Sequence, residues 1–260
     1  MAESIQITSL EEFIEHAMPF AEQGQGFRGV ANSAYPLKPG IGRKRDDVSI
    51  EQVLVQEQAM FTSFKRHLGM FETANSCLDI AIIGQHYGLP TRLLDWSLTP
   101  LTALFFACKS HFDKDGIVYV LPEWVLELRC ENKFYDSIIF DEDLEFINEA
   151  KNNCNENTKD FNIKEYFYYL KDYYSEIPVG KIYPVLKSSR MLSQGSFFTV
   201  HFDPFQDFSN KIEQQFIIPM DGKEKIYKQL ERIGVHEYSI FPDADGLASW
   251  LRRVYFAPLA

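Results

Sequence analysis

Cysteine is scarce in this sequence, and long apolar runs are missing from it. The 260 residues include 4 cysteines, and none of them forms a Cys-x-x-Cys pair. The spacing typical of a structural zinc site is therefore absent, and we expect reduced thiols inside a cell. No apolar run is long enough to cross a membrane, and the first residues lack the basic and apolar regions of a signal peptide. The sequence thus predicts a cytoplasmic protein without a metal site or a membrane partner.

Several common catalytic signatures are missing as well. There is no Gly-x-Gly-x-x-Gly or Walker A sequence, no Gly-x-Ser-x-Gly elbow and no His-Glu-x-x-His. Their absence weighs against a Rossmann dinucleotide site, a P-loop, a hydrolase elbow and a zinc protease. The run "PDADG" at 242–246 begins like a calcium loop but lacks the closing glutamate, so helix capping explains its aspartates better.

Basic residues are fewer than acidic ones, 26 against 37, which gives a net charge of -11. A generic nucleic-acid binder needs clustered cations, so this balance weighs against that class of protein. It leaves room for a local basic pocket that binds a phosphate-bearing small molecule. The chain is 45% hydrophobic with 22 Phe and 13 Tyr, which is enough apolar material for a sizeable core.

Apolar spacing predicts helices and strands that are mixed without a regular βαβ alternation. Helices are expected after Ser9, after Ser49, up to Gly88, from near Pro100, over 223–235, and after Asp243 or Asp245. Strands are expected around Phe27 to Val30 and over 116–121, 181–186, 195–202, 211–220 and 237–241. This mixture predicts an α+β fold with mixed, mostly antiparallel sheets and flanking helices.

We expect one domain over 1–260. Its core blocks would be about 25–121 and 181–220, with a helical insertion at about 122–180. A helix, a strand and a helix would complete the chain over about 221–260.

The stretch "QHYGLPTRLLDWS", residues 85–97, concentrates hydrogen-bonding side chains directly before a very apolar helix. His86 suits a general base or a ribose-hydroxyl partner, and it equally suits a cap at a helix C-terminus. The hydroxyls of Thr91 and Ser97 can face a ligand or close local turns. With Tyr87, these residues form the half of the stretch that we expect to face a ligand.

The other half of that stretch reads as structural. Arg92 and Asp95 lie three residues apart, which favours an internal ion pair over a catalytic role. Trp96 is expected to anchor the core.

Arg28 lies on an expected strand beside Gly29. A glycine there lets a backbone or a ligand approach, and the guanidinium fork can then hold a phosphate or carboxylate. The alternative is an arginine paired with a protein carboxylate such as Asp95.

Two further polar positions stay open between structural and ligand-binding roles. Gln194, four residues after Arg190, is expected on a strand before Gly195, where it could recognise an amide or a ribose or stand beside a β-bulge. Glu213 lies near the start of another expected strand, 211–220, and carries the same alternatives.

Three blocks of this chain are similar to the FRG domain family: "FRG" at 27–29, a long block at 85–107, and "RMLSQGSFF" at 190–198. They run in family order, and "GVHEYSIFPDADGLA" downstream is also similar to the segment that accompanies that domain. The insertion at 122–180 has the least resemblance.

This block layout also resembles mono-ADP-ribosyltransferases of the arginine-serine-glutamate type. Their strand with Tyr-Arg-Gly corresponds to "FRG", and their Ser/Thr strand and following helix correspond to "TRLLDWSLTPLTALFFA". The resemblance implies that Arg28 holds an NAD phosphate. The residues that we assign to nucleotide binding are Arg28, Gly29, His86, Tyr87, Thr91, Ser97 and Arg190.

The third element of that pattern, a strand with a catalytic glutamate, departs from the family. It corresponds either to Gln194 or to Glu213, and a neutral glutamine supplies no charge to an oxocarbenium-like transition state. The catalytic candidates are Arg28, His86, Asp95, Gln194 and Glu213.

The resemblance therefore predicts an NAD-dependent ADP-ribosyltransferase or NAD glycohydrolase with a protein or nucleic-acid acceptor. By analogy, its role would be that of a bacterial toxin or an anti-phage effector. The first alternative is a non-catalytic nucleotide sensor that signals through 122–180. The second is a metal-dependent hydrolase that uses Asp95 and Glu213.

Overall fold

The computed structural model describes residues 3–43, 47–71, 74, 77–125, 127, 179–183 and 189–256. Most of the expected insertion at 122–180 lies outside these residues. The strands are β1 (Glu3–Gln6), β2 (Phe27–Val30), β3 (Leu93–Ser97), β4 (Gly116–Val120), β5 (Val179–Ile182), β6 (Ser196–His201) and β7 (Gln214–Ile218). The helices are α1 (Leu10–Glu22), α2 (Ile50–Leu68), α3 (Cys77–His86), α4 (Pro100–Cys108), α8 (Ser189–Ser193), α9 (Met220–Arg232), α10 (Glu237–Ile240) and α11 (Ala244–Tyr255).

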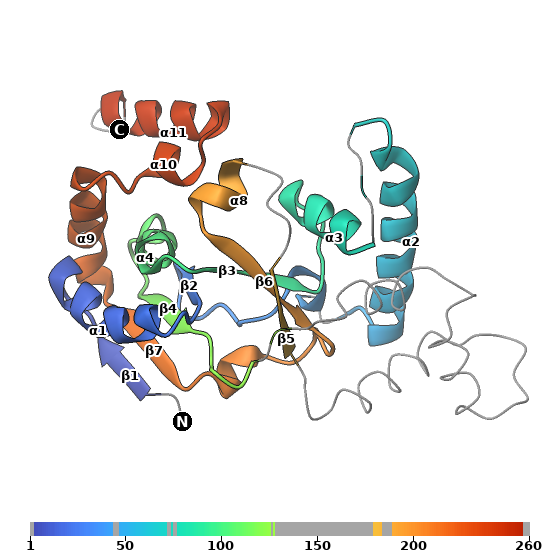
Figure 1. Cartoon of the computed structure of the whole chain (residues 1–260), viewed down its shortest axis with the longest axis horizontal. Helices are drawn as coiled ribbons and strands as arrows, with labels where there is room; N and C mark the ends of the chain where they lie inside the picture. The colour runs from blue at the N-terminus through green and yellow to red at the C-terminus, as the bar shows by residue number, and fades with distance from the viewer. Residues whose placement is uncertain are drawn as a thin grey trace, which may run out of the picture.

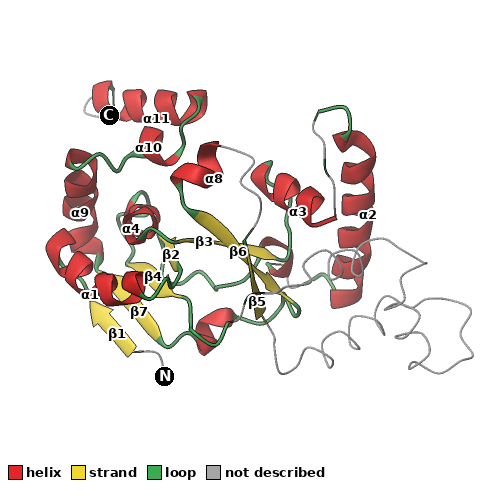
Figure 2. Cartoon of the chain, in the orientation of Figure 1, coloured by secondary structure: helices red, strands yellow, loops and turns green. Residues whose placement is uncertain are grey.

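The strands of the described ranges form one mixed sheet in the order β1-β7-β4-β2-β3-β6-β5. Only the edge pair β1 and β7 is parallel, and every other neighbouring pair in this sheet is antiparallel. Figure 2 shows the strands in the middle of the molecule, with helices on either side. The α+β class with mostly antiparallel strands is thereby confirmed.

The sheet is continuous but narrow at its centre. β3 pairs with β6 along its whole length, whereas β2 and β3 are joined only at Phe27 and Ser97. Beyond that point β2 and β3 separate, so the sheet has two halves. A pocket lies where the two strands separate.

Three clusters of buried apolar side chains form the core around the two halves of the sheet. The first packs α1, α4 and α9 on the β1–β7–β4–β2 half and includes Phe105 and Phe216. A second packs α2 and α3 on the other half and includes Phe61 and Phe198. The third contains Trp96. In Figure 1, α1 and α9 accordingly lie at one end of the molecule and α2 at the other.

Several helices begin where the sequence predicts, because short polar side chains cap their first turns. The hydroxyl of Ser9 accepts from the backbone N–H of Glu12, and Ser49 forms a reciprocal capping box with Gln52. Asp243 caps α11 by accepting from the N–H of Gly246. Each of these three helix starts was expected and is confirmed.

The strand expected over 237–241 is wrong, because these residues form the short helix α10. His236 and Ser239 cap its first turn: the hydroxyl of Ser239 accepts from the N–H of His236, and the imidazole of His236 accepts from the N–H of Ser239. This local cap outweighs the aromatic and β-branched composition that had suggested a strand.

None of the helices in the described ranges combines the length and apolar character that crossing a membrane requires.

Candidate functional site

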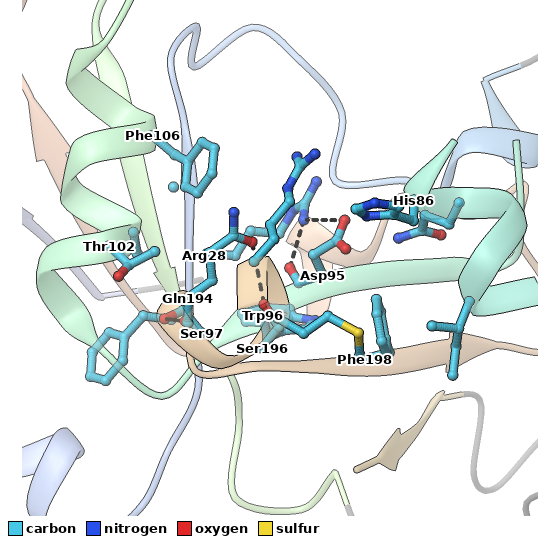
Figure 3. Close-up of a pocket in the computed structure, with 17 residues that line it drawn as sticks. Arg28, His86, Asp95, Trp96, Ser97, Thr102, Phe106, Gln194, Ser196 and Phe198 are labelled. Carbon is cyan, nitrogen blue, oxygen red and sulfur yellow. Dashed lines mark hydrogen bonds and ion pairs between the residues drawn. The ribbon is translucent and has the colours of Figure 1, made fainter. Parts of the chain in front are cut away.

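A pocket of about 240 Å³ opens where β2 and β3 separate. Strands β2, β3 and β6 supply its floor, and α3, α4 and α8 supply its walls. Most of the residues predicted for a site line this pocket: Arg28, Gly29, His86, Asp95, Ser97, Arg190 and Gln194. Figure 3 labels five of them, Arg28, His86, Asp95, Ser97 and Gln194, and shows the aromatic ring of Phe106 on the side of the pocket away from His86. Whether they bind or react stays a prediction.

Arg28 is the most unusual polar group of the pocket. Its Nη1 donates to the backbone oxygen of Asp95 at 2.6 Å and lies 3.8 Å from the Asp95 carboxylate. Its Nε is buried and has no hydrogen-bond partner among the described residues. Burial lowers the pKa of the guanidinium, and the negative charge of Asp95 opposes this shift. A buried donor without an acceptor costs free energy, which a bound anion would recover.

Asp95 lies between Arg28 and His86 in Figure 3. Its side chain is 56% exposed, so its long ion pair with Arg28 contributes little stability. The internal pair expected between Arg92 and Asp95 is wrong. Arg92 instead donates from Nε and Nη2 to the carboxylate of Glu57 at 2.8 and 2.7 Å. Arg92 directly precedes β3 and lies three residues before Asp95, so along an extended chain their side chains project to opposite faces.

Two pocket residues lie at the C-terminal end of α3, and neighbouring side chains hold each of them in place. Gln85 and His86 line the pocket, and the exposed ring of Tyr87 packs edge-on against His86 at 5.1 Å. Thr91 is buried, donates its hydroxyl to the Gln85 side chain and accepts from the N–H of Leu93. Tyr87 and Thr91 therefore lie outside the pocket lining, and Thr91 positions Gln85.

Ser97 ties two turns together at the edge of the pocket. Its hydroxyl donates to the backbone oxygen of Gln194 at 2.6 Å and accepts from the N–H of Thr99. Gln194 lies in the turn between α8 and β6, so its expected place on a strand is wrong. Its side-chain nitrogen donates to Ile240 at 3.2 Å, and its oxygen accepts from Ser196.

Gly29 brings α4 close to β2. A Cβ atom on Gly29 would lie 1.7 Å from the backbone oxygen of Ala103, so only glycine allows this approach. The same contact carries Thr102 and Phe106 into the pocket wall. Of the two expectations for this glycine, the approach of a backbone or of a ligand, the structure shows the approach of a backbone.

Glu213 lies outside this pocket. It is exposed and directly precedes β7, which β4 separates from β2 in the sheet. Within the described part of the chain, Asp95 is the only carboxylate that lines the pocket. No group of three or more histidine, cysteine, aspartate or glutamate side chains in the described ranges could hold a metal ion.

Sequence reasoning missed three polar residues of the pocket: Gln85, Thr102 and Ser196. Thr102 and Phe106 are four residues apart on α4, a spacing that places two side chains on one helix face. Ser196 and Phe198 are two apart on β6 and share one face of the sheet. These spacings are visible in the sequence, but the helix is apolar on most sides, which suggested a central helix and drew attention away from Thr102.

A model of one protein family, described as the FRG domain, matches residues 24–116. That match includes β2, α3, β3 and α4, and hence Arg28, His86 and Asp95, whereas Arg190 and Gln194 lie beyond it. No curated protein matches the chain, and no solved structure matches it.

Proposed function

Because residues 24–116 are an FRG domain, we propose that the pocket of this domain binds NAD or a closely related nucleotide. The observation that carries the proposal is the buried Nε of Arg28, which has no acceptor among the described residues. A guanidinium fork matches the geometry of phosphate oxygens, which would supply that acceptor. The core would then be ADP-ribosyltransferase-like, with β2 holding the phosphate.

The side chains of the other pocket walls suit the base and the ribose of such a nucleotide. Phe106 and Phe198 offer ring and edge surfaces to an aromatic base. Gln85, Thr102 and Ser196 offer amide and hydroxyl groups to ribose hydroxyls or a carboxamide. This combination of apolar walls with a few polar groups is typical of small-molecule sites.

The reaction that we propose is ADP-ribosyl transfer with Asp95 as the pocket's carboxylate. The bond from the ribose C1′ to nicotinamide breaks, and neutral nicotinamide leaves with the bonding electrons. A bond forms from C1′ to the acceptor nucleophile, which releases its proton. Asp95 stabilises the positive charge that develops on the ribose. Gln194 has no charge to offer there, and Glu213 lies outside the pocket.

An NAD-consuming enzyme of this kind would suit a toxin or an anti-phage effector, and its acceptor would be a protein or a nucleic acid. This biological role rests on analogy with the fold alone.

A nucleotide sensor without turnover is the second candidate, and the bonds of Gln194 favour it. Gln194 and Ser193 both donate to the backbone oxygen of Ile240, at 3.2 and 3.1 Å. These bonds connect the pocket directly to α10, so ligand binding could be transmitted to the C-terminal helices.

The test is nicotinamide release from NAD, with and without cell lysate as a source of acceptor. We expect release by the wild-type protein and a loss of about a hundredfold in Asp95→Asn, which removes the charge at constant shape. Glu213→Gln is the matched carboxylate variant outside the pocket and should release nicotinamide as the wild type does.

The alternatives give different results. NAD binding without any nicotinamide release would favour the sensor. Full activity in Asp95→Asn together with loss in Glu213→Gln would show that the wrong carboxylate has been chosen.

A further inference from the structure

The side-chain amide of Gln85 has a defined orientation at the wall of the pocket. Gln85 is the second-last residue of α3 and lines the pocket. The hydroxyl of Thr91 donates to its side-chain oxygen and accepts from the backbone N–H of Leu93. Thr91 is 1% exposed, so an amide turned the other way round would leave the hydroxyl hydrogen buried without this acceptor. The oxygen of Gln85 therefore faces Thr91, and its nitrogen faces away from Thr91.

That nitrogen has no hydrogen-bond partner among the described residues, because the contact with Thr91 uses only the oxygen of Gln85. A side-chain amide nitrogen carries two N–H donors. Nε of Arg28 is a further donor of the same pocket without an acceptor in the described part of the chain. Both groups can be satisfied by a ligand that brings acceptor oxygens, one of them near Arg28 and another near the end of α3.

The order of the groups along the pocket indicates which acceptor reaches Gln85. Asp95 lies between Arg28 and His86 in Figure 3, and Gln85 directly precedes His86 at the end of α3. The proposed function places a phosphate at Arg28 and the ribose C1′ at Asp95. Nicotinamide is attached to C1′, so a nucleotide with its phosphate at Arg28 and C1′ at Asp95 extends toward the end of α3 with its nicotinamide.

The side chains at this end of the pocket suit an aromatic ring that carries a carboxamide. Ile82 lies one turn before Gln85 on α3, lines the pocket, and belongs to the same apolar cluster as Phe198. These two side chains offer apolar surface to the ring faces. NAD contains a single carbonyl group, that of its carboxamide, and a carbonyl oxygen is an acceptor that matches the free donors of Gln85.

We infer that Gln85 donates a hydrogen bond to the carboxamide oxygen of nicotinamide, with Thr91 as the positioning residue that orients the Gln85 amide. The inference rests on the proposed function, since it concerns one end of the same ligand. It names the group by which the pocket distinguishes NAD from dinucleotides that carry another base in place of nicotinamide.

The test compares NAD with two analogues by titration calorimetry on the full chain. Pyridine adenine dinucleotide lacks the carboxamide, and 3-acetylpyridine adenine dinucleotide keeps the carbonyl but replaces the amide nitrogen with a methyl group. We expect the wild type to bind the pyridine analogue about tenfold more weakly than NAD, because the donors of Gln85 then have no acceptor. The acetylpyridine analogue should bind nearly as well as NAD.

Gln85→Met keeps the length of the side chain and removes its donors. We expect this variant to bind NAD about tenfold more weakly than the wild type and to bind the pyridine analogue unchanged. The preference for NAD over the pyridine analogue should therefore disappear. Gln56→Met is the matched control, because Gln56 is exposed on α2, and it should keep the preference of the wild type.

The role of Thr91 is tested with a second pair of variants. Thr91→Val removes the hydroxyl that holds the Gln85 oxygen, so the preference for NAD over the pyridine analogue should fall. Thr91→Ser keeps the hydroxyl and should keep the preference. Thermal unfolding identifies the temperature range in which each variant is folded, and a loss of stability alone does not change this ratio of two affinities.

The outcomes separate this inference from the proposed function. NAD binding by the wild type with equal affinity for the pyridine analogue would overturn the inference and leave the proposed function intact. An unchanged preference in Gln85→Met, or an equally weak binding of both analogues by the wild type, would also overturn it, because another residue or the amide nitrogen of the ligand would then be recognised. Absence of NAD binding by the wild type would overturn both.

Discussion

Arg28 and Arg92 are both largely buried, yet their donors are used differently. Arg92 gives two donors to Glu57 and a third to the backbone oxygen of Phe202. Arg28 leaves a buried Nε without an acceptor among the described residues. A fully bonded arginine indicates a structural role, and an incompletely bonded one beside a pocket indicates a ligand. The sequence had also suggested a structural role for Arg92, but it named the wrong partner, Asp95 instead of Glu57.

A buried histidine gives the protein a predictable response to acid. His201 on β6 is buried, and burial together with the positive charge of Arg28 lowers its pKa to about 3. Trp96 Nε1 donates to the hydroxyl of Thr199 at 2.9 Å, which leaves that hydroxyl to donate to Nε2 of neutral His201 at 3.0 Å. A protonated imidazole has no acceptor to offer, so acid breaks this chain of hydrogen bonds.

Between about pH 6.5 and pH 3, His201 is therefore protonated in the unfolded chain and neutral in the folded chain. We expect the free energy of unfolding to fall by up to about 1.4 kcal/mol per pH unit from pH 6.5 toward pH 3 because of His201. Urea unfolding at several pH values measures this slope. His201→Gln keeps an acceptor for Thr199 without titrating, so its curve should be flatter. Parallel curves would contradict the assignment.

At the scale of elements, the packing of α4 on β2 sets the shape of the site. Gly29 permits that packing, because a Cβ atom there would lie 1.7 Å from the oxygen of Ala103. We expect Gly29→Ala to force α4 away from β2 and to lower the free energy of unfolding by about 3 kcal/mol. Chemical denaturation measures the change.

Gly69→Ala is the matched control for this prediction. Gly69 has φ of -58° and no atom within 4 Å of its virtual Cβ, so alanine should be neutral or slightly stabilising there. Equal stability of the two variants would show that α4 does not depend on the contact at Gly29.

Helix positions were the most predictable elements, because the caps at Ser9, Ser49 and Asp243 are local signals. Strand β1 was missed, since its four residues alternate weakly and are stabilised by pairing with β7 far along the chain. Nor could the sequence show that β2 and β3 touch only at Phe27 and Ser97, although this separation creates the pocket. Register between distant strands is set by tertiary packing, which a single sequence does not display.

At the scale of the whole molecule, the site is assembled from distant parts of the chain. Arg28 and Asp95 are 67 residues apart and belong to the FRG match, whereas Arg190 and Gln194 come from beyond residue 116. Residues from all three similar blocks line this one pocket, which their order along the chain alone does not require.

The measurement that tests the central claim most directly is a calorimetric titration of NAD into the wild-type protein and Arg28→Gln. We expect a binding isotherm for the wild type and a loss of roughly tenfold to a hundredfold in affinity for Arg28→Gln, because a charged hydrogen-bond donor to phosphate is removed. Arg232→Gln, at an exposed position on α9, should bind as the wild type does, and thermal unfolding checks that each variant is folded. Equal NAD affinity in folded Arg28→Gln and the wild type would contradict the account.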